Sequence, residues 1–68
     1  MITDNRTLLK KDVSDLPSIL QESFKKKFGN VNRTIDEIVD NLDLIDLHFA
    51  SNMVIMTYLH MNREKYEN

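Results

Sequence analysis

The stretch that decides the fold is residues 44–61, which read LIDLHFASNMVIMTYLHM. An α-helix turns about 100° per residue, so side chains three and four positions apart share a face. At that spacing the stretch has two apolar faces that lie nearly opposite each other. The first face holds Ile45, Phe49, Met56 and Leu59, and the second holds Leu47, Val54, Tyr58 and Met61. A helix on the surface of a globule needs only one apolar face, so we expect this helix to be covered on two sides.

The composition favours a small all-α domain. The chain has 68 residues, enough for one domain, with one glycine, one proline and no cysteine. An all-β fold would need many more turn residues. Without cysteine there are neither disulfides nor thiolate metal sites, which leaves helix packing and subunit association as sources of stability. The lack of cysteine also suits a reducing compartment, and we expect a cytoplasmic protein.

Residues 1–14 are predicted to form a partly ordered N-terminal arm. Thr3 or Asp4 could cap a short helix that brings Leu9 and Val13 onto one side. The alternative is a frayed terminus with one or two residues docked on the core. We place a single helical domain at residues 15–66 and a frayed tail at residues 67–68.

The first main helix is expected to begin between Ser14 and Pro17, because proline is tolerated in a first turn. It is expected to end at Gly29 in the left-handed conformation. Its apolar residues recur at spacings of three and four and are predicted to cover one side of the helix at residues 44–61. These residues are Leu16, Ile19, Leu20, Phe24 and Phe28.

Thr34 and Glu37 form a capping box, the best-defined helix start in the chain. From Ile35 to Leu59 the apolar pattern runs without a slip, as in one long helix. However, Asp40, Asn41 and Asp43 compete for their own backbone and favour a break. We predict two helices, at residues 34–42 and 44–65, with one continuous helix as the alternative. The expected architecture is a three-helix domain, with a short fourth N-terminal helix as an option and the C-terminal helix in the centre.

The residue types that commonly catalyse reactions or bind metal ions are not arranged for either role. His48 and His60 lie twelve residues apart, about 18 Å along a helix, so they cannot share a metal ion within one chain. No glycine-bounded serine and no phosphate-binding loop is visible. We therefore predict no catalytic, cofactor-binding or metal-binding residues. Polar groups within residues 44–61 also argue against a membrane span.

A helix-turn-helix DNA-binding regulator is the alternative function. A short turn with a glycine precedes residue 35, as in that motif. A lysine patch at Lys25, Lys26 and Lys27, with Lys10 and Lys11, could contact phosphates or an acidic partner. Against this, the net charge is −2 and the helix after the turn is acidic. Nucleic acid is thus a less favoured partner than protein.

The second apolar face is predicted to be a protein interface, formed by Leu47, Val54, Tyr58 and Met61. Methionine and tyrosine are common at interfaces. The alternative is that this face lies in the intrachain core, covered by the N-terminal arm and the first helix. Asn52 interrupts the first apolar face and could meet its own copy in a symmetric pair. We expect a non-enzymatic interaction module, a regulator, inhibitor or adaptor that binds a larger protein as a homodimer, of the size of bacterial or phage accessory proteins.

Overall fold

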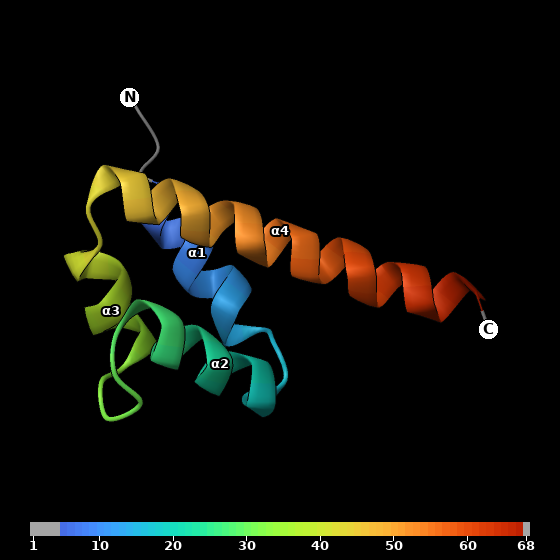
Figure 1. Cartoon of the computed structure of the whole chain (residues 1–68), viewed down its shortest axis with the longest axis horizontal. Coiled ribbons are helices and arrows are strands. Elements are labelled where there is room, and N and C mark those ends of the chain that lie inside the picture. Colours follow the sequence, from blue (N-terminus) through green and yellow to red (C-terminus); the bar gives the residue numbers. More distant parts are fainter. Residues whose placement is uncertain (1–4, 68) are drawn as a thin grey trace.

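The computed structural model describes residues 5–67, with the side chains of residues 5–63, and in this range the chain is all-helical (Figure 1). The four helices are α1 (Asn5–Ser14), α2 (Ser18–Phe28), α3 (Ile35–Asn41) and α4 (Leu44–Glu67). The all-α prediction is confirmed, including the short N-terminal helix. Residues 1–4 of the predicted arm, and Asn68 of the predicted tail, lie outside the described residues.

Helix α1, rather than α4, lies at the centre of the fold. It packs against each of the other three helices, whereas α4 packs mainly on α1 and has little direct contact with α2. Figure 1 shows α1 between α4 on one side and the α2–α3 pair on the other. The prediction of a central C-terminal helix is therefore wrong. Leu9 and Val13 of α1 are buried in the common core, and the boundary expected at residue 15 stays a prediction.

Among the residues whose side chains the structure describes, ten buried apolar residues form the core, and all four helices and their connections contribute to it. Phe24, Val13 and Val39 are its largest fully buried side chains. Phe24 stacks at a tilt on Phe28, with ring centroids 5.0 Å apart. The core members are Leu9, Val13, Leu16, Phe24, Ile38, Val39, Leu42, Leu47, Ala50 and Val54.

The C-terminal part of α4 extends beyond the other three helices (Figure 1). The molecule measures 38 × 32 × 18 Å along its principal axes. Its radius of gyration is 12.4 Å, against about 11 Å for a compact domain of this length. The chain alone is thus flat and open, and it leaves much of its longest helix uncovered.

Polar contacts hold α1 against α3. The Arg6 guanidinium donates a hydrogen bond to the carbonyl oxygen of Val39. One turn later on α1, the Lys10 ammonium lies 2.7 Å from the Asp40 carboxylate. These contacts place two basic residues of α1 on the C-terminal end of α3, where the helix dipole favours positive charge. They explain why a segment with few apolar residues is an ordered part of the bundle.

The last four carbonyl groups of α1 all have hydrogen-bond partners, although a helix end leaves them without intrahelical donors. Backbone N–H groups of Asp15 and Leu16 bind the carbonyls of Lys11 and Val13. The Gln21 amide donates to the Ser14 carbonyl at 2.9 Å, and also to that of Leu16. The Tyr58 hydroxyl donates to the Asp12 carbonyl at 2.6 Å. Tyr58 therefore fastens the end of α1 to α4.

Tyr58→Phe is expected to destabilise the fold by about 1 kcal/mol, because it leaves the Asp12 carbonyl without a donor. Burial, and then the charges of Asp15 and Asp12, raise the pKa of Tyr58 above its ordinary value of 10.0. The neutral phenol is thus favoured in the fold. The stability that the Tyr58 hydrogen bond contributes is fully present below pH 10 and is lost as the pH rises through the raised pKa. Thermal melts of both proteins at neutral pH and above pH 10 check this. Equal melting temperatures at neutral pH would contradict it.

The turn between α2 and α3 departs from one prediction and confirms another. Gly29 follows α2, as expected, but its φ of −168° is extended rather than left-handed. Glycine is needed there for space, since a Cβ atom would lie 2.7 Å from Cγ1 of the buried Ile38. At the start of α3, the Thr34 hydroxyl accepts a hydrogen bond from the backbone N–H of Glu37 at 3.1 Å, so the predicted cap is confirmed.

The break between α3 and α4 confirms the two-helix prediction. The Asp43 carboxylate accepts a 2.7 Å hydrogen bond from the backbone N–H of Asp46 and so caps α4. Leu42 before it has an extended backbone with ψ of 137°. This break lets α4 leave the direction of α3 and lie across α1. A single straight helix would carry the residues after 44 away from the core.

Candidate protein interface on helix α4

The structure buries the face of α4 that was predicted to be an interface. Leu47 is 8% exposed and Val54 only 2%, while Tyr58 and Met61 are partly buried against the core. The prediction that this face lies open is wrong for Leu47 and Val54. The physical reason is that α1, expected to be a loosely held arm, is a packed helix that covers this side. The alternative of an intrachain core holds for these two residues; contact of Tyr58 or Met61 with a partner stays a prediction.

The opposite face of α4 is open. Four large apolar residues, spaced by three and four positions with Asn52 between them, have 59 to 69% of their surface exposed. We call this set the α4 seam: Ile45, Phe49, Asn52, Met56 and Leu59. The expectation that α2 covers this face is wrong. Leu16 and Phe24 instead face the core, and Ile19 is 72% exposed.

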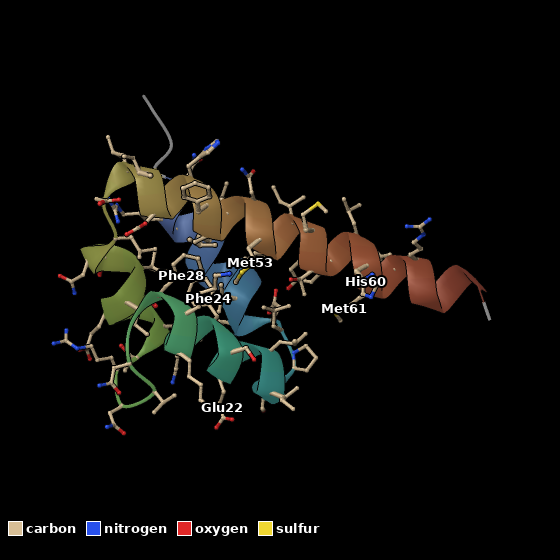
Figure 2. The ribbon with its side chains drawn as sticks, viewed as in Figure 1. Glu22, Phe24, Phe28, Met53, His60 and Met61 are labelled. Carbon is tan, nitrogen blue, oxygen red and sulfur yellow. The ribbon has the colours of Figure 1, made fainter. Side chains whose placement is uncertain are left out.

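A groove runs along one edge of the seam, between α4 and α2. It contains two open hollows of about 520 and 550 Å³ that share Met53. Figure 2 shows Phe28 of α2 and Met53 of α4 beside this space, with His60 and Met61 further along α4. The first hollow is lined by Lys27, Phe28, Asp46, Phe49, Asn52 and Met53. Aromatic and thioether groups dominate its apolar lining, so the groove can accept a large aliphatic side chain.

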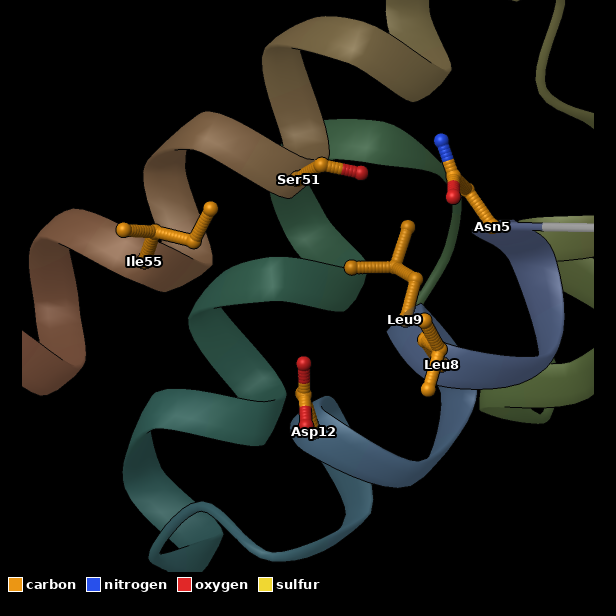
Figure 3. Close-up of a pocket in the computed structure, with 6 residues that line it drawn as sticks. All are labelled: Asn5, Leu8, Leu9, Asp12, Ser51 and Ile55. Carbon is orange, nitrogen blue, oxygen red and sulfur yellow. The ribbon is translucent and has the colours of Figure 1, made fainter. Parts of the chain in front are cut away.

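A smaller hollow of about 200 Å³ lies along the other edge, between α1 and α4 (Figure 3). Leu8 and Leu9 of α1 line it opposite Ile55 of α4, with Ser51 and Asp12 at its polar side. Leu8 and Ile55 are each more than half exposed. The apolar surface of the seam therefore continues onto α1, and the seam lies between this hollow and the groove.

The two ends of α4 differ in charge. At its N-terminal end, Asp43 and Asp46 are exposed, close in sequence to exposed Asp36 and Glu37 of α3. Toward the other end, the sequence balances Arg63 and Lys65 against Glu64 and Glu67, with His60 about one turn before them. None of the five seam residues is charged, but exposed Asp46 and His48 lie between Ile45 and Leu59 in the sequence. A partner thus meets a mainly apolar strip with one polar residue, Asn52, near its centre.

The predicted lysine patch lies in the last turn of α2. Lys26 and Lys27 are exposed and Lys25 is partly buried. Lys10 is paired with Asp40, and Lys27 lines the groove beside Asp46. Helix α3, which would read DNA in a helix-turn-helix, has only seven residues and exposes Asp36, Glu37 and Asp40. These carboxylates would repel phosphates, so nothing in this geometry favours the DNA-binding alternative.

Among the described residues, no group of three or more histidine, aspartate or glutamate side chains is placed to hold a metal ion. Within the same range, no helix combines the length and apolar character needed to cross a membrane. The sequence matches no protein-family model, and the comparisons with curated proteins and with solved structures find no similar chain. The function is therefore inferred from the surface of the chain itself.

Proposed function

We propose that this chain is a non-enzymatic protein–protein interaction module that works as a homodimer and acts as a regulator, inhibitor or adaptor of a larger protein. The observation that carries the proposal is the exposed α4 seam. Its four apolar residues and Ile55 expose roughly 500 Å² at about 100 Å² each, near the upper end of what a monomer leaves open. The largest apolar patch of a monomer is often functional, and this supports an interaction site here.

The physical character of the seam suits protein rather than a small ligand. Its hollows are open along the helix instead of enclosed, and their lining is mainly apolar. Phenylalanine and methionine at its centre provide a large contact area, and methionine adapts its shape to a partner. A helix laid along the seam would cover both edges at once. A cytoplasmic location, expected from the lack of cysteine, belongs to the same proposal.

Sedimentation equilibrium of the wild-type protein tests this function. We expect about twice the chain mass of 8.0 kDa at high micromolar concentration, with dissociation on dilution. Burial of the seam supplies the driving force, at about 25 cal/mol per Å² of apolar surface. A folded species of single-chain mass at every concentration would contradict the homodimer.

A further inference from the structure

We propose that a second copy of the chain occupies the α4 seam in antiparallel orientation, with the two-fold axis within one helical turn of Asn52. This inference rests on the proposed homodimer and adds its orientation and register. Phe49 and Met56 then lie on either side of the axis, and Ile45 of each copy lies near Leu59 of the other.

The chain exposes more surface than is typical of a monomer of its mass. The chain has an accessible surface of 5420 Å², whereas a folded chain of 8.0 kDa exposes about 4,500 Å². The difference, about 900 Å², is comparable with the roughly 800 Å² that each partner contributes to a standard interface. The seam and the hollows at its edges provide a continuous surface for that contact.

Asn52 favours an identical partner. Its side chain is exposed in the middle of the seam, between Phe49 and Met56. An apolar partner would cover this amide and leave its donors and acceptor unpaired. A two-fold axis near Asn52 brings the amide beside its own copy, and two amides can exchange hydrogen bonds. The one polar residue of the seam therefore specifies both the partner and the register.

The charges at the ends of α4 favour the antiparallel orientation. In that arrangement, Asp43 and Asp46 of one copy lie toward the C-terminal part of the other, where the sequence balances Arg63 and Lys65 against Glu64 and Glu67. A parallel pair would instead bring the acidic N-terminal ends of both helices together, with Asp36 and Glu37 of α3 nearby. The antiparallel orientation avoids this repulsion between acidic ends, because like charges placed together are costly. Antiparallel α4 helices also place opposite ends of their dipoles side by side.

The shape of the chain agrees with this arrangement. The C-terminal part of α4 extends beyond its own bundle (Figure 1) and has no helix beside its exposed face. In an antiparallel pair this part lies along the N-terminal half of the partner's α4, next to the groove that Phe28 and Phe49 line. Leu59 is then the aliphatic side chain placed to enter that groove. In a parallel pair the projecting ends would cover only each other.

Cysteine cross-linking tests the orientation directly, because the chain has no cysteine of its own. Ile45→Cys, Leu59→Cys and Asn52→Cys replace exposed residues of the seam, and Ile19→Cys on α2 is the matched background control. The reagent is a bis-maleimide that spans no more than two helical turns, about 11 Å. One protein of each mixture carries a tag, so that mixed dimers differ in mass from identical ones.

We expect the mixture of Ile45→Cys and Leu59→Cys to cross-link at least about tenfold more than either variant alone. Two Ile45 positions are separated by about 21 Å along antiparallel helices, beyond the reach of the reagent. Asn52→Cys should cross-link to its own copy. If Ile45→Cys alone links as well as the mixture, the pair is parallel and the inference fails while the homodimer stands. If every variant cross-links no more than Ile19→Cys and the protein sediments as a monomer, both the orientation and the proposed homodimer are wrong.

Discussion

Replacing Phe49 and Met56 together by glutamate is expected to convert the dimer into folded monomers. Both side chains are about two-thirds exposed in the single chain. Neither belongs to the hydrophobic core or to the partly buried residues that pack against it. Each large apolar side chain contributes about 1.5–3 kcal/mol when it is buried, so the double change should raise the dimer dissociation constant at least about a hundredfold. Four glutamates near the axis of the pair would add like-charge repulsion.

Sedimentation equilibrium measures whether the dimer is lost, and far-UV circular dichroism measures whether the monomer is still folded. The variant should sediment as a monomer at concentrations where the wild type is dimeric, and its helical signal should remain. Ile19→Glu is the matched control, since Ile19 is 72% exposed and lies on α2, away from the seam. It should leave the dimer intact. If the Phe49→Glu, Met56→Glu variant is still dimeric, the seam is not the surface through which the dimer forms.

Val54→Glu is expected to unfold the chain rather than to release monomers. Val54 is 2% exposed and packs in the core, so glutamate there would place a carboxylate among apolar side chains. The cost of burying such a group is several kcal/mol. A chain of 68 residues has a total stability of about 3–10 kcal/mol, so most of it is lost. Residue 54 was expected at an interface, where the same change would only dissociate the pair.

The neighbouring position provides the control. Ile55 is 55% exposed, and Ile55→Glu should keep the helical circular dichroism and the cooperative thermal melt of the wild type. Val54→Glu should lose both at 25 °C. The two variants carry the same new side chain one residue apart, so a difference between them reports burial alone. If Val54→Glu stays folded and monomeric, the face that contains Leu47 and Val54 is the interface after all.

Local features of the chain were predictable because short-range chemistry decides them. Thr34 and Glu37 specify the start of α3, since the hydroxyl needs only a backbone N–H three residues away. The Asp43 carboxylate caps α4 and so starts a new helix there, although the apolar pattern continues through this position. The all-α class followed from the near absence of glycine and proline, with one of each in the chain. The two opposite apolar faces of α4 followed from helical spacing alone.

What covers each face of α4 was decided only by the tertiary structure. Spacing along a helix shows which side chains share a face, but it contains no information about the neighbour that covers them. Helix α1 offers only Leu9 and Val13 to the core, yet Arg6, Lys10 and the Asp12 carbonyl bind it to α3 and α4 over long sequence separations. These contacts place α1 on Leu47 and Val54. Because they exist only in the folded chain, the open seam of Ile45, Phe49, Met56 and Leu59 is a property of the packing.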